Sequence, residues 1–173
     1  MDAIVYTSNT GFTEKYAKML GEKLFLPVYA LRNAESQLAA GSEIIYMGWL
    51  MAGIIKGYKR AARRYKVSAA AGVGMGATGS QKDEVRKVNH LPEKVAAFTL
   101  QGGYDRSRLT GIHKLMMSAA EKTFVSKLED KLERTPDEEA ALDMLLHGGD
   151  YVREENLADL LRWYRNRRPV NQN

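Results

Sequence analysis

Short apolar runs alternate with stretches of helical periodicity over the first two thirds of the chain. Five of these runs have the length and side-chain types of buried strands, and each is bounded by polar residues, glycine or proline. The predicted strands are residues 3–6, 27–31, 42–48, 66–73 and 94–101. Apolar residues three or four positions apart predict helices over residues 14–24, from beyond residue 53 to about residue 65, and over residues 81–89. Strands that alternate with helices predict one open, mostly parallel sheet with helices on both faces.

The C-terminal third of the chain carries helical patterns. Apolar residues recur with helical spacing over residues 112–132. Thr135 and Glu138 then form the Thr-x-x-Glu pattern of a capping box, with proline at the first helical position. The helix that begins there can end at Gly148, and a last amphipathic helix is predicted over residues 154–165. This segment therefore adds helices to the predicted sheet.

A length of 173 residues fits one domain. We expect a single domain over residues 1–173, with a core of about residues 1–132 and a helical extension over about residues 133–173. The alternating pattern fits five parallel strands in the order 2-1-3-4-5, and ligands of such sheets bind beyond the carboxyl ends of the strands. Three turns are then expected to meet at one site: residues 8–13, 49–53 and 74–79.

The first of these turns is rich in hydroxyl groups. Ser8, Thr10 and Thr13 each carry an O–H donor. The backbone N–H groups of Asn9, Thr10, Gly11 and Phe12 can all point into the same turn. The helix that follows favours an anion at its N-terminus because its dipole is positive there. Neither the P-loop pattern nor the dinucleotide-binding glycine pattern follows this strand. The turn is therefore predicted to bind a phosphate group without a lysine.

This turn resembles the first loop of the flavodoxin family, which binds the phosphate of FMN with a Ser/Thr-x-Thr-Gly-x-Thr sequence. Ser8, Thr10, Gly11 and Thr13 match that pattern. The resemblance implies a flavodoxin-like three-layer α/β/α sandwich, non-covalently bound FMN and electron transfer through the flavin. The cofactor-binding residues implied by the three loops are Ser8, Asn9, Thr10, Gly11, Phe12, Thr13, Trp49, Leu50, Met51, Ala52, Gly53, Gly74, Met75 and Gly76.

The third loop departs from the flavodoxin pattern. In that family an aromatic side chain from the second loop often covers one face of the flavin ring, and a tyrosine from the third loop covers the other. Trp49 fits the first role, but residues 74–79 contain no aromatic side chain. Glycine there lets the backbone approach a ligand closely. One face of the ring is then expected to stay open to a second molecule.

A second resemblance involves residues 100–109 and 113–117. With Tyr104, Arg106 and Arg108 leading into a Lys-Leu-Met segment, they are similar to flavodoxin-like proteins grouped with the menaquinone-linked protoporphyrinogen IX dehydrogenase. This resemblance implies an alternative function, an FMN-dependent enzyme that oxidises a porphyrinogen and passes electrons to a quinone. A further alternative is a flavodoxin-like binding or regulatory module without redox activity. Fold alone does not decide among these functions. Asp105 in this stretch is expected to be a turn residue.

Composition and charge narrow the choice of partners. The chain lacks cysteine, which excludes disulfides and thiolate sites, and its net charge is +5 with a pI near 9.3. Five basic residues recur at helical spacing and are predicted to share one helix face: Lys56, Lys59, Arg60, Arg63 and Arg64. This face is either solvated or attracts an acidic redox protein, a quinone-bearing anionic membrane or an acidic substrate. Nucleic acid is not favoured, because no nucleic-acid-binding motif accompanies the charge. We expect a soluble cytoplasmic protein.

Overall fold

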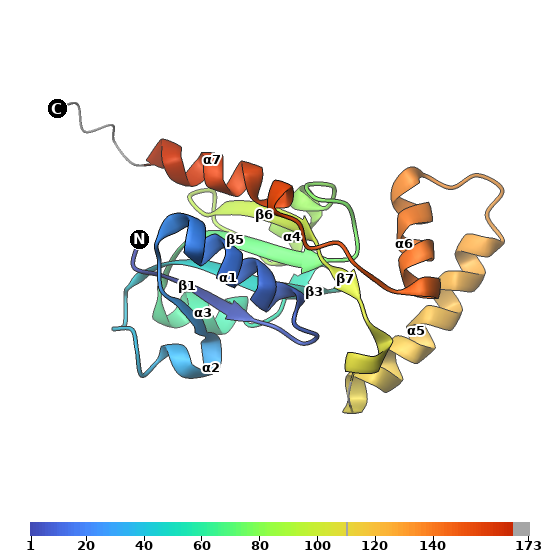
Figure 1. Ribbon diagram of the computed structural model, residues 1–173, viewed down its shortest axis with the longest axis horizontal. Helices are drawn as coiled ribbons and strands as arrows, with labels where there is room; N and C mark the ends of the chain where they lie inside the picture. Colours follow the sequence, from blue (N-terminus) through green and yellow to red (C-terminus); the bar gives the residue numbers. More distant parts are fainter. Residues whose placement is uncertain (110, 168–173) are drawn as a thin grey trace.

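The computed structural model describes residues 1–109 and 111–167, which form a mostly parallel sheet flanked by helices (Figure 1). The strands of the main sheet are β1 (Ala3–Thr7), β2 (Val28–Ala30), β3 (Glu43–Met51), β4 (Ile54–Ile55), β5 (Lys66–Gly74) and β6 (Ala96–Gln101). The helices between them are α1 (Phe12–Leu24), α2 (Leu31–Ala34), α3 (Tyr58–Arg64) and α4 (Lys82–Val88). The α/β class expected from the alternating pattern is confirmed.

The main sheet differs from the expected five-stranded sheet in its strand count. Within the described residues its path is β2-β1-β3-β5-β6, all parallel, and β4 is a sixth strand that pairs antiparallel with β3. The prediction of a loop over residues 49–53 was wrong, because β3 continues to Met51 and returns through a tight hairpin. Ala52 (φ 48°) and Gly53 (φ 74°) both adopt the left-handed conformation that two-residue hairpins require.

Each face of the sheet carries its own apolar core. On one face, Ile44 and Tyr46 of β3 pack with α2, α3 and α4. On the other face, Ile45 and Met47 pack with α1 and with α7 (Ala158–Arg167). The alternation of β3 residues between the faces follows from the two-residue period of a strand. Residues 69–71 of β5 are alanines that are fully buried between β3 and β6, where pairing on both sides outweighs their weak strand preference.

The remaining elements form an insertion that leaves the sheet after β6. They are β7 (Gly103–Tyr104), the 3₁₀ turn η1 (Arg106–Arg108), α5 (Gly111–Glu129), α6 (Pro136–His147) and β8 (Gly149–Asp150). The 3₁₀ turn η2 (Glu154–Leu157) follows the insertion and leads into α7. β7 and β8 pair antiparallel at the base of the insertion. In Figure 1, α5 and α6 project beyond the ends of the main strands, whereas α7 lies beside α1. We call residues 103–150 the insertion.

The packing of α7 changes the expected division of the chain. We expected the core to end near residue 132, but Leu157 and Leu160 are fully buried in the core that contains α1. The capping box at the start of α6 is confirmed, since Thr135 Oγ1 accepts from the Glu138 N–H at 3.3 Å and Glu138 Oε2 accepts from the Thr135 N–H at 2.9 Å. Among the described residues, no helix has both the length and the apolar character to cross a bilayer.

Candidate functional site

The register of the sheet brings the ends of four strands to one edge. Thr7 pairs with Gly48, Trp49 with Val73, and Gly74 with Gln101. The turns that follow β1, β3 and β5 therefore leave the sheet at its carboxyl edge, where parallel sheets bind their ligands. The insertion begins at the same edge, after β6.

The first turn, residues 8–11, leads directly into α1. Gly11 precedes the helix with φ 95°, a conformation that favours glycine, and its N–H donates to Ser8 Oγ at 3.1 Å. Thr13 is buried, and Ser8 and Thr10 are half-buried at the rim. The first N–H groups of a helix lack intrahelical acceptors, and the helix dipole favours negative charge beside them. This geometry can hold an anion.

The second predicted segment is divided between the two faces of the sheet. Leu50 packs over β5, where a Cβ on Gly74 would lie 3.1 Å from Leu50 Cδ1. Gly74 is therefore explained by packing. Strand alternation directs Trp49 and Met51 to the opposite face, which α1 covers. Trp49 is half-buried, and the Lys56 ammonium lies 5.6 Å from its ring centroid. Trp49 can thus form a wall on the side of the first turn.

The hairpin between β3 and β4 is held against α4. Asn89 Nδ2 donates to the Gly53 carbonyl at 2.8 Å, and Asn89 Oδ1 accepts from the Ile55 N–H at 2.8 Å. A Cβ on Gly53 would lie 3.4 Å from Val88 of α4. Gly53 therefore packs on the α4 side of the sheet, and the structure does not bring it to the first turn with the other predicted residues.

The third turn contacts the insertion. Met75 packs with Tyr104, Leu109 and Met144, which form a small separate core. The aromatic side chain that the third turn lacks is thus present next to it, on β7 of the insertion. Tyr104 is 6% exposed, and its hydroxyl has no hydrogen-bond partner among the described residues. Gly76, like Met75, is half-buried.

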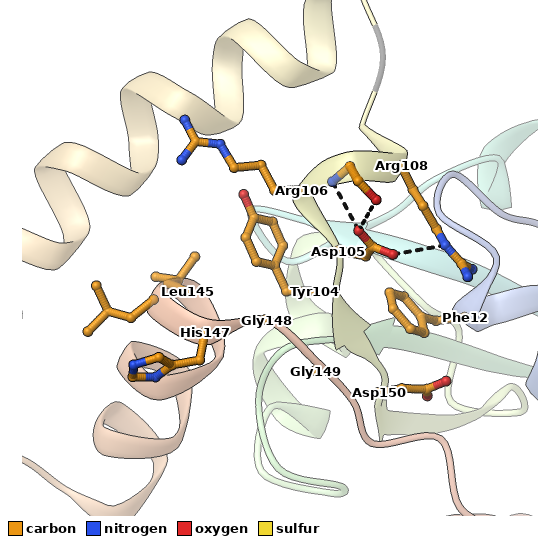
Figure 2. Close-up of a pocket in the computed structure, with 12 residues that line it drawn as sticks. Phe12, Tyr104, Asp105, Arg106, Arg108, Leu145, His147, Gly148, Gly149 and Asp150 are labelled. Carbon is orange, nitrogen blue, oxygen red and sulfur yellow. Dashed lines mark hydrogen bonds and ion pairs between the residues drawn. The ribbon is translucent and has the colours of Figure 1, made fainter.

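A cavity of about 420 Å³ lies between the start of α1 and the insertion (Figure 2). It is lined by Phe12, Tyr104, Asp105, Arg106, Ser107, Arg108, Leu145, Leu146, His147, Gly148, Gly149 and Asp150. Phe12 is the member of this lining that the sequence analysis placed in the site. The volume is in the range of small-molecule sites. The cavity therefore adjoins the first turn, and it does not lie over the ends of β3 and β5.

The carboxylates at this cavity are paired with basic side chains. Asp105 accepts from the Ser107 N–H at 3.0 Å and from Arg108 Nε at 2.9 Å. The hydrogen bonds from Ser107 lower the pKa of Asp105, and the positive charge of Arg108 lowers it further. Asp105 caps η1 and is the turn residue that we expected. Burial acts to raise the pKa of Asp150, but the hydrogen bonds from Lys15 and the Val152 N–H, together with the charges of Lys15 and Arg108, outweigh burial and leave this pKa lowered. Both carboxylates are structural partners of cations at neutral pH.

Sequence reasoning did not place the insertion at the first turn. Tyr104, Arg106 and Arg108 were noticed through a resemblance to a family, and that resemblance gave no position for them in space. Arg108 bonds to Thr10 across 98 positions of the chain, a distance over which no local pattern operates. The side chains of residues 113–117, which belong to the same resemblance, lie outside the described residues.

The five basic residues do not form one helix face, which corrects the expected stripe. Helix α3 begins at Tyr58, after Gly57 with φ 84°, so Lys56 precedes the helix. Arg60 pairs with Glu35 at 3.0 Å. Lys59 and Arg63 are exposed, one helical turn apart. Helix α3 therefore presents Lys59 and Arg63 to solvent as an i, i+4 pair of cations, beside Arg60, which is exposed but ion-paired with Glu35.

Comparisons of the chain with protein-family models, with curated proteins and with solved structures gave no match. Among the described residues, no three His, Asp or Glu side chains gather as they would around a metal ion. The inference of function therefore rests on the residues at the carboxyl edge of the sheet.

Proposed function

We propose that this chain is a flavodoxin-like protein that binds FMN non-covalently and transfers electrons through it. The observation that carries this proposal is the first turn: its Ser-x-Thr-Gly-x-Thr sequence follows β1 at the carboxyl edge and runs into α1 through the left-handed Gly11. A bound flavin supplies one- and two-electron redox chemistry, and the protein holds and orients it.

The residues of the first turn fit a phosphate group. Ser8 and Thr10 are half-buried hydroxyl-bearing residues at its rim, and Gly11 sets the backbone conformation that opens α1. Hydrogen bonds to a charged group contribute about 1.5–3 kcal/mol each, more than bonds between neutral groups. A turn of hydroxyl and amide donors can therefore bind a phosphate monoester tightly. Trp49, on the same face as α1, is the proposed wall for the ring.

The cavity beside Phe12 favours a second candidate, an FMN-dependent dehydrogenase that acts on a separate substrate. The insertion encloses about 420 Å³ next to the first turn, with Tyr104 and Phe12 as aromatic walls. A protein that only carries electrons has no need for such a second space. In this candidate a porphyrinogen gives up hydrogen to the flavin and a quinone accepts the electrons.

The test of the proposal is titration of the apoprotein with FMN, followed by visible absorbance. We expect Thr10→Val to weaken FMN binding about tenfold or more, because it removes a donor to a charged group and keeps the side-chain shape. Riboflavin, which lacks the phosphate, is the control ligand, and its affinity should not change. Unchanged FMN affinity in Thr10→Val contradicts the phosphate assignment.

Two further readouts separate the candidates. If the wild-type protein is colourless and takes up no FMN, both redox candidates are rejected. The function that then remains is a binding or regulatory module without redox activity. Turnover of a porphyrinogen by the FMN-loaded protein, with electrons passed to a quinone, would favour the enzyme over the carrier. If the protein does not turn over a porphyrinogen but a protein donor reduces its flavin rapidly, the carrier is favoured.

A further inference from the structure

Arg108 reaches from the insertion to the first turn. Its Nη1 donates to the Thr10 carbonyl at 3.2 Å and lies 3.3 Å from the position that a Cβ on Gly11 would occupy. Figure 2 shows the side chain leaving η1 and running toward the segment that carries Phe12. The sequence analysis treated the first turn as neutral, but the fold brings a guanidinium group against its backbone.

The same guanidinium is held on its other side by Asp105. Arg108 Nε pairs with Asp105 Oδ2 at 2.9 Å, and Ser107 fixes that carboxylate through its N–H and its hydroxyl. The Arg108 side chain is still 52% exposed. A guanidinium has several N–H donors in a planar fork, and this shape matches two oxygens of a phosphate. The described bonds to Asp105 and Thr10 use Nε and Nη1, so the other terminal nitrogen, Nη2, can still meet a ligand.

We propose that Arg108 supplies the positive charge of the phosphate site at the first turn, and that the insertion thereby selects a doubly charged phosphate monoester. This inference rests on the proposed function, since it concerns the same turn. Hydroxyl and amide dipoles bind an anion, but a full positive charge within about 4–6 Å favours the charged form much more strongly. Arg108 bonds to the Thr10 carbonyl, so its charge would act across this turn on an anion held by the N–H and O–H groups of the same turn.

The neighbouring cations have other partners. Lys15 is paired with Asp150, and its ammonium lies 5.7 Å from the ring centroid of Phe12. Arg106 belongs to the same short η1 turn as Arg108, but it leaves toward α5 and pairs with Glu121 at 3.7 Å (Figure 2). Arg106 is 64% exposed and therefore provides a matched control: the same residue type, two positions away, directed away from the first turn.

The test compares FMN with riboflavin in Arg108→Gln and Arg106→Gln, by titration of apoprotein at low and high salt. We expect Arg108→Gln to weaken FMN about tenfold or more and to leave riboflavin unchanged. The salt dependence of FMN binding should also flatten, because a screened charge pair has been removed. Arg108→Lys should keep part of the FMN affinity, and Arg106→Gln should match the wild type. Thermal unfolding checks that both Gln variants are folded.

Two outcomes overturn the inference. In one, Arg108→Gln binds FMN as the wild type does; in the other, FMN and riboflavin weaken equally, which would mean that Arg108 only positions the turn. If the wild-type protein binds no FMN, the proposed function is overturned. The charge role of Arg108 is then tested with inorganic phosphate as the probe. Phosphate binding that weakens in Arg108→Gln but not in Arg106→Gln supports the charge role. Phosphate binding that is absent, or equal in both variants, rejects it.

Discussion

The phenolic oxygen of Tyr16 accepts a 2.6 Å hydrogen bond from Nδ2 of Asn156, although the two residues are 140 positions apart. The same oxygen donates to the Gln101 carbonyl at 2.5 Å. Tyr16 is fully buried, and burial raises the pKa of its phenol, so it stays a neutral donor and acceptor. One side chain of α1 thus ties the end of β6 to the segment that precedes α7.

Tyr16→Phe should lower the free energy of unfolding by about 1–3 kcal/mol, because it leaves the Gln101 carbonyl and the Asn156 amide without their buried partner. Urea denaturation measures the change. A double-mutant cycle with Asn156→Ala isolates the pair, and we expect a coupling of about 0.5 kcal/mol or more. Strict additivity of the two substitutions would show that the bond adds nothing beyond the separate contacts.

Gly57→Ala should be far more destabilising than Gly41→Ala, although the two glycines have nearly equal φ angles of 84° and 82°. Left-handed backbone costs alanine about 1–2 kcal/mol at either site. At Gly57 a Cβ would also collide with the Tyr46 hydroxyl and lie 2.7 Å from Thr7 Oγ1, whereas nothing lies within 4 Å at Gly41. Overpacking adds about 1–3 kcal/mol. Equal losses in the two variants, measured by chemical denaturation, would refute this difference.

Glu43 should stabilise the fold at neutral pH and lose this effect in acid. It accepts from Ser68 Oγ at 2.5 Å and from Arg167 Nη2 at 2.7 Å, and these bonds lower its pKa from 4.5 to about 2. The unfolded chain takes up the proton at higher pH than the folded chain, so acid favours unfolding. Glu43→Gln should therefore cost about 1–3 kcal/mol above pH 4.5.

The difference in free energy of unfolding between Glu43→Gln and the wild type should then shrink as the pH falls from 4.5 toward 2. Unfolding curves across this range measure it. Glu35→Gln is the control: Arg60 lowers the pKa of Glu35 as well, but both side chains are exposed and the effect should be smaller. A difference for Glu43→Gln that stays constant down to pH 2 would contradict the assignment.

Trp49→Ala should change FMN affinity and relieve the quenching of flavin fluorescence, if the indole forms a wall of the ring site. Trp163→Ala is the control. Trp163 lies on α7 with its ring 6.0 Å from that of Phe98, in the core beside α1. Fluorescence of bound FMN that is the same in both variants would assign Trp49 to packing alone.

Reversal of the exposed pair on α3, Lys59→Glu with Arg63→Glu, should slow flavin reduction by an acidic redox protein and flatten its salt dependence. This pair avoids Arg60, which is ion-paired with Glu35. Lys82→Glu with Lys87→Glu on α4, two exposed lysines, changes the net charge equally. Equal slowing by the two double variants would mean that total charge acts, and that α3 has no special part.

Local pattern determined much of the fold. The spacing of apolar residues is sufficient to predict the five parallel strands and most helices, because side-chain periodicity reflects backbone geometry within a few residues. The capping box of Thr135 and Glu138 was readable for the same reason, since both of its bonds join residues three apart. The turn at Ser8–Gly11 was also visible, because its hydroxyls, its glycine and the following helix are contiguous.

Only the tertiary structure decided how distant segments meet. Ala52 adopts the left-handed conformation in the β3–β4 hairpin, which alanine rarely does, and Asn89, far along the chain, holds that hairpin through Gly53 and Ile55. The return of α7 to the sheet depends on buried contacts such as Tyr16 with Asn156. Arg108 reaches Thr10 because β7 and β8 anchor the insertion beside α1. Such contacts form when the whole chain packs, and no local periodicity encodes them.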